Sequence, residues 1–399
     1  MNILFLSLLD FNSLKEKNIY TDLLRCFCEN GHHVCAISPV EKRLDKNTEL
    51  IKESNCDILK LKIGNIQKTN IFEKGISTLR IESKFIDGIK KYFPNRKFDL
   101  VLYSTPPITF QKVVNFVKKR DQSKSYLLLK DIFPQNAVDL EMITKRGAIY
   151  RFFRNKEKKL YKSADFIGCM SKGNKDYLIK NNPWLEPSKV EINPNSKTIS
   201  SLRVNDNKTS IRTKFGIPED KVVFLYGGNL GKPQGLDFLI EYLKVHDIED
   251  AFFLIIGSGT EYKKLESFFS EVKPKNAVLL TQLPKNEYTE LEQTADVGLV
   301  FLDSRFTIPN IPSRILGYMD AAIPILAATD VNTDLKDLIQ EGQFGLWVKH
   351  GDIEAFKSEV TKFLDSQFRK TKGENARVFL ESEFDVKKSY QLIIEKMGK

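Results

Sequence analysis

The chemistry that the sequence suggests most directly is phosphate binding, at a loop that leads into a predicted helix. Residues 310–314 read Asn-Ile-Pro-Ser-Arg, and the apolar spacing from Ile315 onward predicts that a helix opens there. The unpaired N–H groups and positive dipole end of a helix start attract anions, and an arginine adds a full charge. The candidate phosphate ligands of this segment are Asn310, Ile311, Pro312, Ser313 and Arg314.

A glycine-rich loop offers a second phosphate contact. Residues 222–228 have the apolar pattern of a buried strand that ends in two glycines, and a helix is predicted over 236–245. Glycine lets the backbone approach a diphosphate closely, and a lysine in the same loop can neutralise its charge. The candidate ligands in this loop are Gly227, Gly228, Asn229 and Lys232.

Carboxylate and amide side chains follow a third predicted strand, over 126–130. Ligands of parallel sheets gather beyond the carboxyl ends of the strands, so these side chains would meet an acceptor substrate there, with Asp131 as a candidate catalytic residue. An equally compatible interpretation is that Asp131 or Asp139 only caps the helix that follows. The candidate acceptor-side residues are Asp131, Gln135, Asn136 and Asp139.

The order of elements predicts an α/β protein with two doubly wound domains. An apolar run at residues 2–9, a helical pattern from Ile19 to Glu29 and a strand pattern at 33–39 open one such sheet, and residue 222 opens another. A chain of 399 residues is too long for one ordinary core. We therefore expect domains at 1–195 and 196–383, and a final helix within 384–399 whose apolar face can pack back on the first domain.

Charge is distributed unevenly along the chain. Lys and Arg outnumber Asp and Glu by 36 to 22 in residues 1–200, whereas residues 201–399 contain 26 basic and 30 acidic residues. A helix predicted over 142–162 contains eight basic residues and one acid, which favours contact with an anionic membrane surface beside Phe152 or Phe153. The alternative is a solvated face. The basic stripe consists of Arg151, Arg154, Lys158 and Lys162.

Several other classes of protein fit the sequence poorly. No motif typical of nucleic-acid binding is present, and no apolar run is long enough to span a membrane. Five scattered cysteines indicate reduced thiols. The four histidines are not at the spacing of metal ligands, and the sequence contains no D-x-D motif, so no metal site is indicated. We expect a cytoplasmic protein without a metal cofactor, and peripheral association with the inner face of the plasma membrane stays open.

Four segments, in the same order and at similar spacing, resemble the donor-binding elements of family 4 retaining glycosyltransferases of the GT-B class. They are residues 226–236, 255–261, 279–302 and 307–328. The resemblance implies two Rossmann-like domains facing a cleft, with a nucleotide sugar bound by the second domain and an acceptor by the first. It further implies metal-independent transfer from a UDP-sugar to a lipid-diphosphate-linked saccharide of bacterial capsule or O-antigen. The backbone of Gln282 and Leu283 would hold the base.

The chain departs from this family at four charged positions. Asn229 and Gln234 stand where arginine and lysine are usual, so the resemblance assigns stabilisation of the departing diphosphate to Arg314 and Lys232. Pro309 and Gly317 stand where two glutamates are usual, the second of which binds the nucleotide ribose. These losses leave an alternative: a degenerate GT-B protein that binds a sugar nucleotide or a partner without catalysis.

Overall fold

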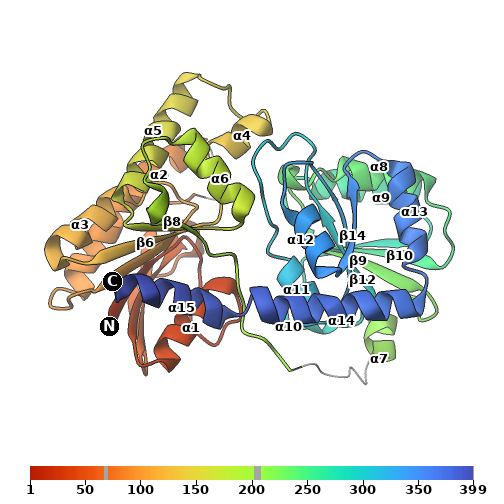
Figure 1. Ribbon diagram of the computed structural model, residues 1–399, viewed down its shortest axis with the longest axis horizontal. Coiled ribbons are helices and arrows are strands. Elements are labelled where there is room, and N and C mark those ends of the chain that lie inside the picture. The colour runs from red at the N-terminus through yellow and green to blue at the C-terminus, as the bar shows by residue number, and fades with distance from the viewer. Residues whose placement is uncertain (67–70, 202–207, 399) are drawn as a thin grey trace. The chain divides into compact units, whose positions relative to one another are not determined.

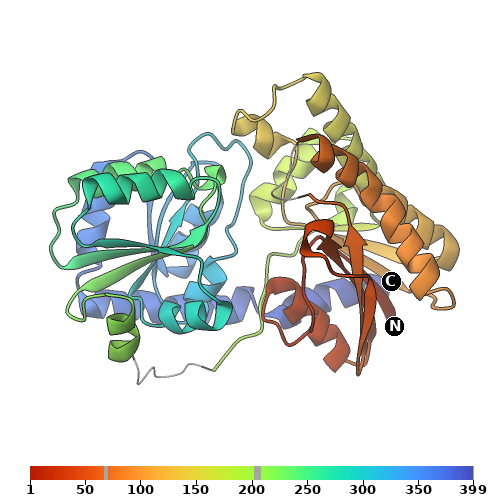
Figure 2. The same cartoon turned by 180° about the vertical axis from the view of Figure 1, so that it is seen from behind.

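The computed structural model describes residues 1–66, 71–201 and 208–398, without the side chains of residues 71–76, 78 and 79. The chain forms two compact units. The first contains Met1–Thr198 and Val386–Lys399, and the second contains Ile199–Asp385. Figures 1 and 2 show that each unit is a sheet with helices on both faces. The boundaries predicted from the sequence lie two or three residues from these.

The first unit contains a sheet of eight strands. The strands are β1 (Asn2–Leu6), β2 (His33–Glu41), β3 (Glu49–Glu53), β4 (Cys56–Ile63), β5 (Leu100–Ser104), β6 (Lys124–Leu129), β7 (Phe166–Cys169) and β8 (Val190–Ile192). Their order is β3-β4-β2-β1-β5-β6-β7-β8, and β3 alone among them pairs antiparallel. The helices are α1 (Ile19–Glu29), α2 (Ile71–Tyr92), α3 (Gln111–Asp121), α4 (Gln135–Asp139), α5 (Ala148–Ser163), α6 (Lys172–Asn181) and α15 (Val386–Met397), with 3-10 turns η1 (Lys42–Leu44) and η2 (Pro187–Lys189).

The last helix of the chain completes the core of the first unit. Ile393 of α15 is fully buried in the cluster formed by β1, β2 and α1. The Tyr390 ring lies 5.0 Å from the Phe27 ring, and its hydroxyl lies 3.0 Å from Nε2 of His32. Residues four positions apart share one helix face, so the apolar stripe of α15 meets α1 along its length.

The second unit contains a sheet of six parallel strands in the order β11-β10-β9-β12-β13-β14. The strands are β9 (Val222–Asn229), β10 (Ala251–Ser258), β11 (Ala277–Thr281), β12 (Val297–Phe301), β13 (Ile325–Thr329) and β14 (Gly345–Lys349). The helices are α7 (Lys208–Lys214), α8 (Asp237–Val245), α9 (Tyr262–Val272), α10 (Lys285–Glu292), α11 (Ile315–Asp320), α12 (Leu335–Gly342), α13 (Ile353–Lys362) and α14 (Ser366–Glu383), with the turn η3 (Lys232–Gln234).

The strand order determines which loops can form a binding site. In the second unit the chain runs from β9 outward to β11 and then returns to the other side of β9 with β12. Open α/β sheets bind ligands at such a reversal, beyond the carboxyl ends of the strands. The loops after β9 and β12 therefore flank a candidate site, as do the loops after β1 and β5 in the first unit.

The structure differs from the sequence-based elements in two places. The helix predicted over 142–162 begins only at Ala148, because residues 142–147 form a turn in which Arg146 has a positive φ of 65°. In the segment 41–84 the sequence predicts only a strand near Asp57–Ile63, which is β4, whereas the structure also contains β3 and part of α2 there. Among the described residues, no helix is both long and apolar enough to cross a bilayer.

Candidate functional site

Arg314 lies at the start of α11 and is held against the end of β9. Its guanidinium carbon is 4.2 Å from the centre of the Tyr226 ring, and Nη1 donates a hydrogen bond of 3.1 Å to the carbonyl oxygen of Gly227. Stacking on an aromatic face stabilises a cation without neutralising it. No carboxylate among the described residues lies within ion-pair distance of this guanidinium. The site therefore presents a positive charge that an anion can pair with.

The two glycines at the end of β9 have different roles. Both polar groups of the Gly227 backbone are used inside the protein, because its N–H donates to the Tyr318 hydroxyl at 3.3 Å and its carbonyl accepts from Arg314. Gly228 is exposed, has a φ of 122° that favours glycine, and would place a Cβ 3.9 Å from the guanidinium carbon of Arg314. Of the two glycines predicted to contact a diphosphate, only Gly228 therefore remains a candidate.

The neutral residues at 229 and 234 form a structural pair. The Gln234 side-chain oxygen accepts from the backbone N–H of Gly231 at 3.3 Å and from the Asn229 amide at 3.4 Å. These bonds close the turn η3 and orient the loop after β9. Lys232 in this turn is exposed and has no ion-pair partner in the described part of the chain. Lys232 is free to move toward a diphosphate.

The loop before α11 is anchored from a neighbouring loop. Asn332 donates to the carbonyl oxygen of Phe306 at 2.6 Å, and the Thr333 hydroxyl donates to that of Asn310. Ile311 is buried, Ser313 is exposed, and Pro312 accepts the N–H of Ile315 at 3.3 Å. The predicted helix start is present, but α11 has only six residues. Its dipole is correspondingly weak, so the charge at this site comes mainly from Arg314.

The residues predicted to hold a base lie at the end of β11. The side-chain oxygen of Gln282 accepts a hydrogen bond of 2.7 Å from the Ser258 hydroxyl, and Ser258 pairs with Asn229 across β10 and β9. Leu283 follows and is partly buried. The loops after β9, β10 and β11 therefore adjoin at one edge of the sheet.

In the first unit, Asp131 lies in the loop after β6, next to Lys130, in a network of hydrogen bonds. The Thr105 hydroxyl accepts from the backbone N–H of Asp131 at 3.2 Å and donates to its carbonyl oxygen at 3.1 Å. The Asn136 amide donates to the Asp131 carboxylate at 2.7 Å. Burial raises the pKa of Asp131 to about 6, against the effect of the Asn136 and Ile132 donors. The carboxyl group can therefore gain and lose a proton near neutral pH.

Neither aspartate of this segment caps α4. The residue at the N-cap position is Pro134, which makes no capping hydrogen bond through its side chain. The Asp139 carboxylate, at the other end of the helix, accepts a hydrogen bond of 2.7 Å from the Gln135 side-chain amide. The capping alternative is thus excluded for α4. The Asn136 side-chain oxygen is buried and has no hydrogen-bond donor among the described residues.

Sequence reasoning missed Lys130 and Thr105 beside Asp131. Burial lowers the pKa of Lys130 to about 7, and its Nζ lies 3.4 Å from the carbonyl oxygen of Asn193. Thr105 joins the ends of β5 and β6 through one hydroxyl group. The signal for Lys130 was its position, because a lysine that directly follows a buried strand has few routes to water.

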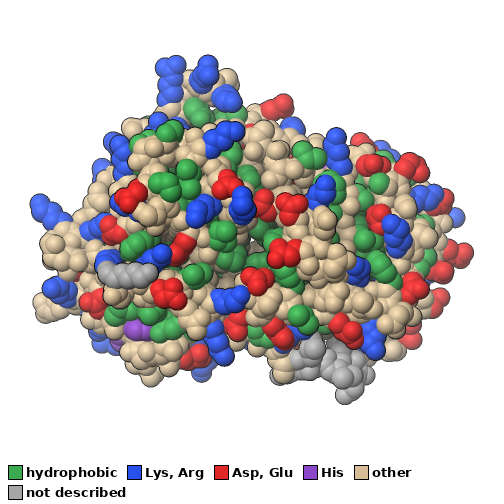
Figure 3. All heavy atoms as spheres, viewed as in Figure 1, with side chains coloured by type: hydrophobic (Ala, Val, Ile, Leu, Met, Phe, Trp, Pro, Cys, Tyr) green, Lys and Arg blue, Asp and Glu red, His purple; other side chains and the backbone are tan. Residues whose placement is uncertain are grey.

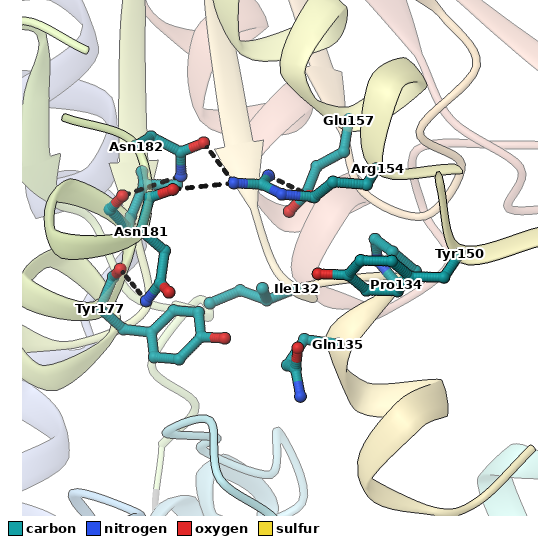
Figure 4. A pocket seen from close by; sticks show the side chains of 10 residues that line it. Ile132, Pro134, Gln135, Tyr150, Arg154, Glu157, Tyr177, Asn181 and Asn182 are labelled. Carbon is teal, nitrogen blue, oxygen red and sulfur yellow. Dashed lines mark hydrogen bonds and ion pairs between the residues drawn. The ribbon is translucent and has the colours of Figure 1, made fainter. Parts of the chain in front are cut away.

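A small pocket with a cavity volume of about 40 Å³ opens next to this segment, and it is far smaller than the pockets that enclose whole ligands. Figure 4 shows the hydroxyl groups of Tyr150 and Tyr177 directed toward the space beside Gln135 and Ile132. Arg154, Glu157, Asn181 and Asn182 form another wall. Hydroxyl, amide and aromatic groups on one wall are the groups with which proteins bind saccharides.

The basic stripe predicted on α5 is divided by the fold. Arg154 points inward, where it pairs with the buried Glu157 and donates to the Asn181 carbonyl at 2.9 Å and the Asn182 side chain at 2.7 Å. Glu157, the one acid of this stretch, is buried and requires a cation beside it. Arg154 therefore lines the pocket, and the prediction that it contacts a membrane surface is corrected. Arg151, Lys158 and Lys162 are exposed.

Comparison with known proteins identifies the second unit. Residues 207–379 match the family described as "Glycosyl transferases group 1". This segment contains the loops after β9, β11 and β12. The match extends over most of the second unit.

Relatives and solved structures extend this assignment. The chain is 25% identical over 304 residues to the "Probable glycosyltransferase WbjE" of Pseudomonas aeruginosa, covering 71% of this chain and 70% of the relative. It is 22% identical over 364 residues to a protein from the cps region of Klebsiella pneumoniae, covering 87% and 92%. The resemblance to GT-B glycosyltransferases predicted from the sequence is confirmed.

Two solved glycosyltransferases have the same fold. The lipopolysaccharide-biosynthesis glycosyltransferase WaaG aligns with a TM-score of 0.67 at 16% identity, over 98% of this chain and 99% of that one. Anabaena HepE in complex with UDP-glucose aligns with a TM-score of 0.71 at 13% identity, over 100% and 99%. Both alignments extend over both units, so the GT-B fold includes the first unit as well as the transferase domain.

Arg314→Ala is expected to lower the turnover of the GT-B enzyme more than Lys232→Ala. Arg314 is fixed on Tyr226, whereas Lys232 is exposed, and losing a fixed charge at a developing diphosphate costs about 2–4 kcal/mol, or roughly 30- to 1000-fold. Arg314→Lys retains the charge and should lose less. Turnover at saturating donor measures this, with the exposed Lys263→Ala as control. Equal turnover of Arg314→Ala and wild type would remove Arg314 from the site.

Asp131→Asn is expected to raise the melting temperature near neutral pH. The folded pKa of about 6 lies above the ordinary 3.8, so ionisation costs stability as the pH rises through this window and costs nothing below it. The amide removes a penalty of at most about 3 kcal/mol, which corresponds to a few degrees. Calorimetric scans near pH 4 and pH 8 measure it, with the exposed Asp176→Asn as control. A variant that melts lower at both pH values contradicts the pKa assignment.

Proposed function

We propose that the chain is a retaining glycosyltransferase that moves a sugar from a UDP-sugar to a lipid-diphosphate-linked saccharide in bacterial surface polysaccharide biosynthesis. The observation that carries the proposal is the Arg314 guanidinium. It is fixed by Tyr226 and Gly227, has no described carboxylate within ion-pair distance, and lies beside the exposed Gly228. Such a site binds a doubly charged diphosphate.

The finer assignments are supported by relatives of the same fold. HepE was solved with UDP-glucose, which favours uracil as the base of the donor. WaaG acts in lipopolysaccharide biosynthesis, and the Klebsiella relative is encoded in a cps region, which favours a surface polysaccharide as the product. The edge formed by Ser258 and Gln282 is a suitable place for the base, since a base needs backbone and amide groups.

The transfer needs no protein nucleophile. The bond between the sugar carbon and the diphosphate oxygen breaks, the acceptor hydroxyl oxygen bonds to the same face of that carbon, and the hydroxyl proton passes to the departing diphosphate. Negative charge grows on the diphosphate during this step, and fixed positive charge stabilises it. Arg314 supplies that charge from a fixed position, and Lys232 supplies a second from the adjoining loop.

Donor binding is proposed to be independent of a metal ion, because Arg314 and Lys232 supply the charge that a divalent cation would otherwise supply. The described residues contain one cluster with metal-ligand atoms close together, His33, Cys35 and Asp57. It belongs to the first unit, and Asp57 is already paired with Arg96 at 3.3 Å and with His33 at 2.9 Å.

The acceptor saccharide is assigned to the first unit. The Asp131 carboxylate, which the Asn136 amide orients, accepts hydrogen bonds from sugar hydroxyls, and the Tyr150 and Tyr177 hydroxyls can do so from the pocket beside Gln135. Asp139 and Arg154 have supporting roles, since each is bonded to a neighbour that lines the pocket.

The lipid part of the acceptor is proposed to lie in a membrane that the first unit contacts at the start of α5. Met142, Ile149 and Phe152 are 63%, 59% and 46% exposed there. Lys145, Arg146 and Arg151 are exposed among them, and residues 142–156 include no acid. Figure 3 shows basic and hydrophobic side chains together over the end of the molecule where α5 begins. Exposed apolar side chains can enter the lipid interface, while the basic side chains beside them attract anionic headgroups.

UDP is expected to bind the purified protein in the presence of EDTA. Calorimetry measures this directly, and Arg314→Ala should reduce the affinity, whereas Lys263→Ala should not. Binding that appears only after manganese is added contradicts metal independence. Binding without turnover of any UDP-sugar, on extracted lipid-linked saccharides as acceptors, would favour the degenerate GT-B protein that binds without catalysis.

Wild-type protein is expected to sediment with anionic vesicles at low salt and to be released at high salt, where charges are screened. Each basic residue contributes about 1 kcal/mol near an anionic leaflet, so replacing three by serine should weaken binding roughly 100-fold. The test variant is Lys145→Ser/Arg146→Ser/Arg151→Ser. The control with the same change in charge, further along α5, is Lys158→Ser/Lys159→Ser/Lys162→Ser.

Comparing the two variants shows whether the start of α5 or the more distant part of its basic face contacts the membrane. If the control variant loses binding and the test variant keeps it, the membrane contact follows the stripe predicted from the sequence rather than the exposed turn. If wild type does not sediment with anionic vesicles, a soluble acceptor replaces the lipid-linked one.

A further inference from the structure

The carboxylate of Glu292 fills the space beside Gly317. A Cβ on residue 317 would lie 2.7 Å from Oε1 and 3.1 Å from Oε2 of Glu292. A contact of 2.7 Å does not occur between such atoms, so the carboxylate of Glu292 would have to move if residue 317 had a side chain. Gly317 is in α11 and Glu292 is the last residue of α10. One helix thus presents a carboxylate at a position where the other has no side chain.

Glu292 is oriented by the same structure that holds the phosphate site. The Tyr288 hydroxyl, one turn earlier on α10, donates to Oε1 of Glu292 at 3.1 Å. That hydroxyl also lies close over β9, since a Cβ on Gly227 would be 2.0 Å from it. Tyr288 therefore connects the end of β9 with Glu292. Both positions depend on glycine, at 227 and at 317, to leave room for side chains from α10.

Position 317, beside which the Glu292 carboxylate lies, is one helical turn from Arg314. Residues 314 and 317 are three positions apart along the chain, which on one helix face corresponds to about 5–6 Å between Cβ positions. A carboxylate repels phosphate but accepts hydrogen bonds from neutral hydroxyls, and an acidic residue near the phosphates that binds the ribose hydroxyls is a recurring feature of nucleotide sites. In a nucleoside diphosphate, the ribose is the next group along from the phosphates.

We propose that Glu292 binds the ribose hydroxyls of the donor nucleotide, with its carboxylate in the place that a side chain at residue 317 would take. The inference rests on the proposed function, because it requires a nucleoside diphosphate at Arg314. It assigns ribose recognition to α10, the helix that directly follows Gln282 and Leu283. Base and ribose are then bound by consecutive parts of the chain, and the diphosphate by α11 and the loops after β9 and β12.

The test compares UDP with 2′-deoxy-UDP by calorimetry. Wild type is expected to bind UDP about tenfold or more tightly than the deoxy nucleotide, because a hydrogen bond to a charged group is lost. Glu292→Ala should bring the two affinities within about twofold of each other, mostly by weakening UDP binding. Glu290→Ala, an exposed glutamate on the same helix, is the matched control and should keep the wild-type ratio.

Relocation of the carboxylate distinguishes recognition from a packing role. Glu292→Ala/Gly317→Glu should restore the preference for UDP, whereas Gly317→Glu alone should weaken UDP binding, because the new side chain meets the Glu292 carboxylate. Glu292→Ala with both affinities reduced and the ratio unchanged overturns the inference and leaves Glu292 as a support for Tyr288. Equal affinities in wild type also overturn it. If wild type binds neither UDP, ADP nor GDP, the proposed function fails and this inference fails with it.

Discussion

The contact between the Arg314 guanidinium and the Tyr226 ring is the interaction on which the rest of the donor site depends. An aromatic face and one backbone carbonyl stabilise the cation while leaving its charge uncompensated, which a carboxylate partner would not do. Tyr318, from the same helix, bonds to both neighbouring peptide groups of β9. The helix and the strand are thereby fixed relative to each other, and the loops that follow take their positions from them.

The fold and the strand-end loops could be predicted from the sequence, because both are local patterns. Apolar runs of strand length followed by glycines, or by Asp131, are visible without any knowledge of contacts. What could not be predicted depends on distant partners. Gln234 looked like a lost charge, yet it closes the turn that orients Asn229. Thr105 and Lys130 gained their roles only when β5 and β6 became neighbours.

The helix α5 shows where charge patterns are insufficient. Its basic residues share one face of the helix, but Arg154 points inward because it pairs with the buried Glu157. Among the apolar residues of the same helix, Ile149 and Phe152 face solvent whereas Leu160 is buried. The glutamate positions illustrate the same limit. A position-by-position comparison registers Gly317 as a loss, whereas the structure places a carboxylate from another helix there. Function can persist at a place in space while the residue responsible changes its place in the chain.

The packing of α15 on α1 has a consequence for the way the protein is made. The core of the first unit includes Val386 and Ile393, which leave the ribosome only after all of the second unit has been synthesised. Domains usually fold in order from the N-terminus during synthesis. Here the transferase domain is the first that can be completed, and the first unit must wait with part of its apolar surface open. During that interval a chaperone would find its binding surface on α1, beside Phe27, until the last twelve-residue helix covers it.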